Sequence, residues 1–283
     1  PMPIELELPG MPGAPTPTAA APPEPEEYNI QMERRRMGET LVGSNEIDAL
    51  VSTINAYDTA TILEFGGQPA KEVARCSDKL LNSMSAPTAV DPGLMLANLG
   101  CIMNTFDVTE IQLLNKKSLL LMSSSLQQKK LDQMLEKYRR LGDELDRIQV
   151  HLKQYEWELR ETNKKMDDLF YANVNYFQQL VKYILAGEQG LQELEQHIAA
   201  RKAEFELTKD PNLRFDIETL EQSYRVLQRR VEDLRLAEVV AMQSIPSVKL
   251  VQNGNLDMIR KIDSAFLVTL PVFKQALTQA VMF

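Results

Sequence analysis

The sequence predicts an all-α fold in which a small helical head is followed by a long antiparallel coiled-coil-like helical hairpin or three-helix bundle. Three features support this. Apolar residues recur at alternating steps of three and four through residues 131–183 without a proline. Aromatic residues make up 6% of the chain and there are only 12 glycines, which favours helices over a many-stranded sheet. The segment TKDPN at 208–212 then breaks the pattern, and a second apolar stripe follows.

The first apolar stripe, called here the long seam, has the spacing of a helix that buries one narrow face against a partner helix. Only Thr162 and Asn173 within it are polar, and the intervening positions carry the charges. At a rise of about 1.5 Å per residue the segment spans roughly 80 Å, too long for a compact globule. The long seam consists of Leu131, Met134, Tyr138, Leu141, Leu145, Ile148, Leu152, Tyr155, Leu159, Thr162, Met166, Leu169, Asn173, Tyr176, Leu180 and Tyr183.

A return helix follows the break, and the short turn between the two helices requires them to pack antiparallel. Gly187 and Gly190 are expected to weaken or kink the first helix. Pro246 is expected to open a further helix, which would kink or stop near Pro271. The return seam consists of Ile217, Leu220, Tyr224, Leu227, Val231, Leu234 and Ile245.

The chain divides into three predicted parts. Residues 1–27 form a proline-rich tail without lysine or arginine, which we expect to be disordered because it cannot bury enough apolar surface. Residues 28–117 form the helical head, where Ser44 can cap a helix and residues 107–110 (DVTE) form a capping box. Residues 60–65 are the one segment that could be a weak strand. Residues 118–283 form the stalk, which either ends at Phe283 or lacks a C-terminal part.

The composition argues against several functional classes. The formal net charge is −9, which disfavours broad nucleic-acid binding because phosphate attraction drives it. No apolar stretch approaches the roughly 20 residues that span a bilayer, so no transmembrane segment is expected. The two histidines, His151 and His197, lie in unrelated helical segments, and no phosphate-binding glycine loop is present. We therefore predict no catalytic, cofactor-binding or metal-binding residues.

Cys76 and Cys101 stand 25 positions apart and form no CxxC pair. Both lie in apolar helical contexts, so we expect two buried free thiols.

Three passages together resemble a known family. They are FGGQPAKEVARCSDKLL at 65–81, YANVNYFQQLVKYILAGE at 171–188, and a region from 234 to 274 that contains QSIPSVKLVQNGN at 243–255. Their order and spacing are similar to the bacterial toxic-anion-resistance family, the TelA-like or KlaA-like proteins, from about residue 44 to the end. Phe273 stands where the family usually has tryptophan, Lys249 where it usually has arginine, and members commonly continue past this point.

The resemblance implies a cytoplasmic bacterial protein, membrane-associated only through partners, that is linked to resistance to tellurite and to phage or envelope-directed agents. It implies a phenotype and supplies neither a mechanism nor catalytic residues.

Two hypotheses follow. The first is a non-enzymatic helical scaffold that binds protein partners of unknown identity, with self-association through the long seam as a further expectation. Its predicted partner surface, which could equally be a solvated helix face, consists of Gln243, Lys249, Gln252, Asn253, Asn255, Lys261 and Lys274. The alternative is thiol-dependent detoxification or sequestration of an oxyanion through Cys76 or Cys101. It requires an accessible thiolate with a basic neighbour, such as Arg75 beside Cys76.

Overall fold

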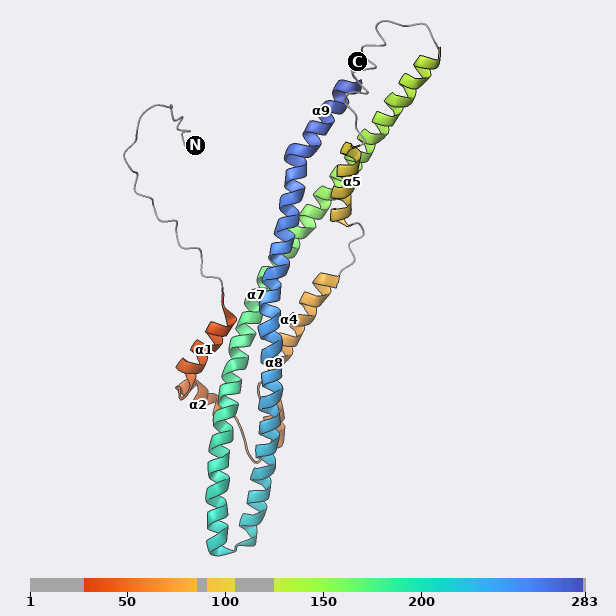
Figure 1. The fold of residues 1–283 in the computed structure, drawn as a ribbon. Coiled ribbons are helices and arrows are strands. Elements are labelled where there is room, and N and C mark those ends of the chain that lie inside the picture. The colour runs from red at the N-terminus through yellow and green to blue at the C-terminus, as the bar shows by residue number, and fades with distance from the viewer. Residues whose placement is uncertain (1–27, 86–90, 105–124, 282–283) are drawn as a thin grey trace, which may run out of the picture.

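The computed structural model describes residues 28–85, 91–104 and 125–281, and these residues form helices joined by turns, with no strand among them. The predicted all-α fold with a helical hairpin is thereby confirmed. In chain order the elements are α1 (Ile30–Leu41), α2 (Asn45–Val51), α3 (Thr59–Glu64), α4 (Gly67–Ser85), α5 (Pro92–Asn104), α7 (Ser125–Thr208), α8 (Pro211–Ser264), the π-helical turn η1 (Ala265–Thr269) and α9 (Leu270–Val281) (Figure 1).

The hairpin of α7 and α8 forms the axis of the molecule (Figure 1). With 84 residues, α7 has a contour of about 126 Å. The predicted break is confirmed. Lys209 adopts a positive φ of 53° and ends α7, and Pro211 starts α8. The side chain of Asp210 caps α8 by accepting a hydrogen bond of 2.9 Å from the backbone N–H of Asn212.

The described members of the long seam are buried or half-buried. Leu145, Leu152 and Leu180 have no exposed surface, and Thr162 and Tyr176 are half-buried. The return seam is buried as well, since Leu220, Leu227 and Leu234 are fully covered and the other members are buried or half-buried. The two stripes meet only between Met166 and Tyr183, which share a core with Leu227 and later residues of the return seam. The earlier part of the long seam packs against α5, the end of α8, η1 and α9.

The first four helices lie along the hairpin rather than beyond its end. In Figure 1, α1, α2 and α4 flank α7 and α8 above the tip, and α4 contacts both long helices. One core cluster joins Ile47, Ile62 and Val73 of these helices to Phe177 and Ile184 of α7. The N-terminal helices and the hairpin thus share a hydrophobic core. The predicted tail at 1–27 and the capping box at 107–110 lie outside the described residues.

Two glycines of α7 mark close approaches between helices. A Cβ atom built at Gly187 would lie 2.5 Å from Cγ2 of Val231 on α8, and one at Gly190 would lie 2.8 Å from Cδ1 of Ile54. Meanwhile α7 continues as an α-helix through both positions. Both positions therefore require glycine because a side chain would overlap with a neighbouring residue. The helix itself continues past them.

The prediction that Pro246 opens a helix is wrong, because α8 runs from Pro211 to Ser264 with Pro246 inside it. Ile245 and Val248 beside it are buried, and burying them compensates for the hydrogen bond that proline cannot donate. Near Pro271 the predicted irregularity is present. The π-helical turn η1 directly precedes α9, whose second residue is Pro271.

Two N-terminal segments also differ from the sequence-based expectation. Residues 59–64 form helix α3 rather than a strand, and Asp58 caps it by accepting from the N–H of Ala60 at 3.0 Å. Helix α1 was not predicted, although Asn29 is a recognisable cap. Its side chain accepts from the N–H groups of Gln31 and Met32, both at 3.0 Å.

The glycine contact gives a first prediction. Gly187→Ala should lower the free energy of unfolding by about 1–3 kcal/mol, because the β-branched, buried Val231 cannot rotate away from the added methyl. The control is Gly142→Ala, where no atom lies within 4 Å of the new Cβ. It should raise stability by about 0.5–1 kcal/mol through helix propensity. Urea unfolding followed by circular dichroism measures both, and equal effects would contradict the close approach.

The long seam gives a second prediction. Leu152 is fully buried and its neighbour Lys153 is exposed. Leu152→Ala should cost about 2–5 kcal/mol because it leaves a cavity, whereas Lys153→Ala should change stability by less than about 0.5 kcal/mol. The same unfolding experiment decides, and a small effect at Leu152 would mean that the seam is misplaced.

Candidate functional site

Two of the seven predicted partner residues form a polar cluster between α8 and α7. The side chain of Gln252, only 7% exposed, donates to Oδ1 of Asp167 at 2.7 Å and to the carbonyl oxygen of Asn163 at 3.1 Å. Asn255 donates to Oδ1 of Asn163 at 2.8 Å. These amides bind α7 within the chain, so they fix how the two helices are aligned.

Two predicted lysines also contact α7. The ammonium group of Lys249 lies 3.6 Å from Oδ1 of Asp167 and 4.4 Å from the centre of the Phe170 ring. Lys274, on α9, donates to Oδ1 of Asp146 at 2.7 Å. Both lysines are therefore engaged in intramolecular contacts, Lys249 between α8 and α7 and Lys274 between α9 and α7.

The remaining three residues, Gln243, Asn253 and Lys261, are exposed. Gln243 and Asn253 belong to a larger surface, the outer face of α8, which we define as the exposed residues between positions 236 and 256. Its members are Leu236, Val239, Val240, Gln243, Pro246, Leu250, Asn253, Gly254 and Leu256. None of them is charged. Lys261 lies one helical turn beyond the end of this face.

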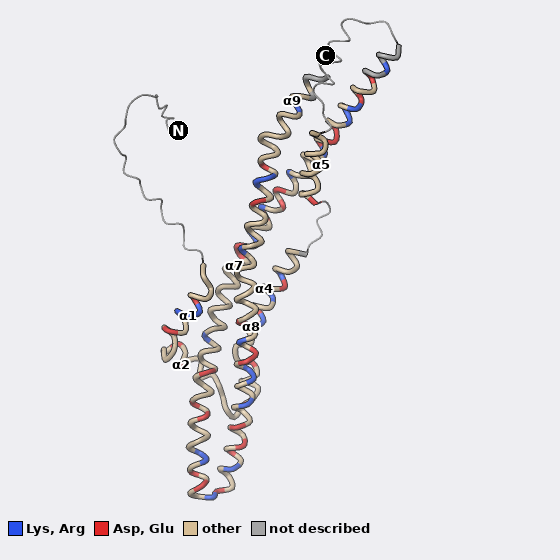
Figure 2. Tube along the Cα trace, viewed as in Figure 1, with Lys and Arg blue, Asp and Glu red and all other residues tan. Residues whose placement is uncertain are grey.

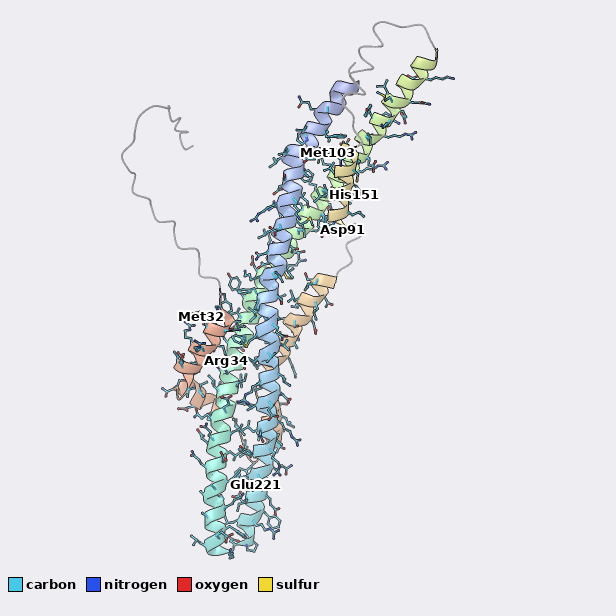
Figure 3. All side chains as sticks on the ribbon, viewed as in Figure 1. Met32, Arg34, Asp91, Met103, His151 and Glu221 are labelled. Atoms are coloured by element: carbon cyan, nitrogen blue, oxygen red, sulfur yellow. The ribbon has the colours of Figure 1, made fainter. Side chains whose placement is uncertain are left out.

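The stretch from 236 to 256 contains only two charged residues, Glu238 and Lys249. Both pair with residues of other helices, although the side chain of Lys249 remains half-exposed. Glu238 is buried and forms an ion pair with Arg34 of α1. Arg34, labelled in Figure 3, extends from α1 beside the hairpin. Lys249 binds α7 as described above. The outer face is therefore free of charge over about 30 Å, and the central part of α8 is mostly tan in Figure 2.

The outer face has a regular spacing of its own. Its exposed residues recur at steps of three and four from Leu236 through Val239, Gln243, Pro246 and Leu250 to Asn253. Leu250 is 74% exposed and Leu236 67%. The stripe is uncharged and mostly apolar, with the amides Gln243 and Asn253 in it. Such a stripe with heptad spacing on an exposed helix is typical of a protein-binding face. Sequence reasoning assigned one apolar stripe to each helix and missed this second stripe of α8. The signal for it was present in the sequence, because only Glu238 and Lys249 are charged between Arg235 and Asp257.

A groove of about 1020 Å³ lies between α4, α7 and α8. Its lining carries three carboxylates, Glu72, Glu158 and Asp168, against two lysines, Lys79 and Lys165. The buried thiol of Cys76 also belongs to it. This balance of charge is net negative and does not favour an oxyanion.

The two cysteines have different surroundings. Burial, reinforced by the charge of Glu72, raises the pKa of the Cys76 thiol against the opposing effect of Lys79. Cys101 is exposed on α5, so the expectation of burial is wrong for it. Helix α5 turns Leu99 and Ile102 inward, and Cys101 lies on its other side. Both thiols are free.

Within residues 28–85, 91–104 and 125–281, no group of three or more His, Cys, Asp or Glu side chains is placed to hold a metal ion. In the same part of the chain, none of the helices combines the length and the apolar character needed to cross a bilayer.

The architecture and the outer face define an elongated all-α protein that presents an uncharged helix surface. The family model described as toxic anion resistance protein (TelA) matches residues 47–283. The chain therefore belongs to the TelA toxic anion resistance family, which confirms the resemblance seen in the sequence.

Several curated relatives match the same region. The uncharacterised protein YceH of Bacillus subtilis (strain 168) is 33% identical over 236 residues, which is 83% of this chain and 64% of the relative. The uncharacterised protein Lmo1967 of Listeria monocytogenes is 27% identical over 84% of this chain and 60% of its own. The TelA-like protein SAB1262 of Staphylococcus aureus is 23% identical over 85% and 64%. The chain thus spans somewhat less than two thirds of these relatives. No solved structure matches it.

The contrast between the thiols gives a third prediction. At neutral pH an aromatic disulfide reagent should label Cys101 rapidly and Cys76 at least about tenfold more slowly, because Cys76 is buried and its raised pKa reduces the thiolate fraction. Single-cysteine variants, Cys101→Ser and Cys76→Ser, separate the two rates. In denaturant both variants should react at the same rate. Fast labelling of native Cys76 would contradict the structure.

Proposed function

We propose that this chain is a non-enzymatic helical scaffold that contributes to bacterial stress or envelope-insult resistance by binding a helical protein segment. It acts in the cytoplasm and reaches the membrane only through its partners. The observation that carries this proposal is the outer face of α8, which is uncharged, exposed and spaced like a helix-packing seam.

The physical basis is the apolar surface that α8 leaves in water. Leu236, Val239 and Leu250 are each about half exposed or more, and covering apolar area yields about 25 cal/mol per Å². A partner helix laid along α8 would cover all three at once. The one half-exposed charge beside this face, on Lys249, already has Asp167 as its partner, so binding there removes water from few charged groups.

The thiol-dependent alternative receives less support. Reduction of an oxyanion by a cysteine requires an accessible thiolate. Cys76 is buried with a raised pKa, and the groove beside it carries more carboxylates than lysines. Cys101 is exposed, but the sequence places no lysine or arginine between positions 80 and 115 to favour its thiolate. These observations favour the scaffold over thiol chemistry.

A resistance assay tests the proposal. A tellurite-sensitive bacterial host expressing the chain should lose the protection when Val239→Glu and Leu250→Glu are combined, because two carboxylates would then lie on the binding face. The host's inhibitory tellurite concentration should return to that of cells without the protein. Circular dichroism should be unchanged, since both positions are exposed.

Two control variants accompany this experiment. Leu207→Glu places the same charge at an 87% exposed leucine at the hairpin tip, and it should leave resistance intact. The double variant Cys76→Ala, Cys101→Ala should also retain resistance. If the folded outer-face variant protects cells as well as the unchanged chain does, the proposal is wrong. Loss of protection in the cysteine variant would support the thiol mechanism instead.

A further inference from the structure

We propose that the helical segment bound by the outer face of α8 is the same face of a second copy of this chain. The two α8 helices would lie antiparallel, related by a two-fold axis that passes beside Pro246. This inference rests on the proposed function, because it names the partner of the same surface.

The uncharged centre of the face is compatible with this pairing. In an antiparallel pair, residues equally far from Pro246 on either side lie opposite each other. Leu236 and Leu256, ten residues before and after Pro246, are both exposed and would meet at each end of the apolar part. Val239 would meet Asn253. Gln243 would meet Lys249, whose half-exposed ammonium already pairs with Asp167 of its own chain.

The charges beyond the apolar centre determine the direction of pairing. Arg229, Glu232 and Arg235 lie 17, 14 and 11 residues before Pro246, so their charges read plus, minus, plus. At the same three distances after Pro246 the sequence carries the opposite pattern, minus, plus, minus. These residues are Asp257, Arg260 and Asp263. Antiparallel pairing about Pro246 therefore opposes unlike charges three times at each end, whereas parallel pairing would oppose like charges at every one of these positions.

All six of these residues are at the surface, and five are exposed while Asp263 is half-buried. Four of them already take part in ion pairs within the chain. These are Arg235 with Glu188 at 2.6 Å, Arg260 with Asp257 at 3.2 Å, and Asp263 with Arg160 at 3.4 Å. Such surface pairs contribute little to stability, so the side chains can turn toward a second copy, or bind both partners, at small cost.

The size of the paired surface is sufficient. From Arg229 to Asp263 the helix extends about 50 Å, and a helix contact is on the order of 10 Å wide. The strip covers on the order of 500 Å² on each copy, or about 1,000 Å² in total, which is near the lower end for specific protein interfaces. In Figure 1 no other helix passes in front of α8 along this stretch.

Analytical ultracentrifugation of the full chain over a range of concentrations tests the association. The unchanged chain should sediment as a dimer that dissociates on dilution. Val239→Glu with Leu250→Glu should sediment as a monomer, while Leu207→Glu at the hairpin tip should behave like the unchanged chain. A monomer at every concentration of the unchanged chain would overturn the proposal.

Charge reversal tests the direction of pairing. Glu232→Arg would place the new arginine opposite Arg260 of the second copy at both ends of the pair. Arg260→Glu would likewise place the new glutamate opposite Glu232 of the second copy. Each single variant should raise the dissociation constant about tenfold or more. The double variant restores opposite charges at these positions and should return the constant to near its original value. Additive weakening in the double variant would overturn the antiparallel arrangement.

Crosslinking locates the axis. In a Cys76→Ser, Cys101→Ser background, Pro246→Cys should be joined to its own counterpart by a short bismaleimide. Arg229→Cys should not, because its counterpart would lie about 50 Å away. Efficient crosslinking of both variants would indicate parallel pairing and contradict the proposal.

The two proposals fail in different experiments. If the chain is monomeric and the outer-face variant still abolishes tellurite resistance, the second copy is ruled out while the scaffold function stands. If the chain dimerises as described and the outer-face variant retains resistance, the dimer stands and the proposed function is wrong.

Discussion

The packing of α7 against α8 is the interaction on which the rest of the structure depends. Each seam is a narrow stripe on a helix far longer than a compact domain, so each helix needs the other along almost its whole length. Ile47, Phe65 and Val73 of the N-terminal helices join the same core. They could not be buried there unless α7 and α8 were already side by side.

Polar contacts inside this interface fix the alignment of the two helices. Asn173 donates a hydrogen bond of 2.8 Å to the hydroxyl of Ser244, and both residues are buried. Gln252 adds its bonds to Asn163 and Asp167 further along. A shift of one helix by a turn would leave these groups buried without partners, which is costly. Apolar contacts alone discriminate less between such shifts, so the polar residues define which side of α8 faces outward.

The outer face of α8 is a consequence of that alignment. Glu238 is buried against Arg34, and Lys249 pairs with Asp167 at the edge of the α7–α8 interface. The exposed positions of this stretch are left to uncharged residues. Pro246 lies in the middle of this face without ending the helix, because its neighbours Ile245 and Val248 are buried against the core. A helix that satisfies its charges internally and exposes leucine and valine has surface available for a second helix.

The sequence by itself determined the helical class, the long and return seams, the break at 208–212 and the family, because apolar periodicity, turn residues and family-like passages are local properties of the chain. Only the tertiary structure decided which neighbour covers each helix face. It showed that Gly187 lies where α7 closely approaches Val231 of α8. It also showed that α8 continues through Pro246 and that Cys101 is exposed. It also divided the seven predicted partner residues into four that bind α7 and three that face solvent. Periodicity identifies residues that share one side of a helix, but what covers that side depends on how distant segments pack.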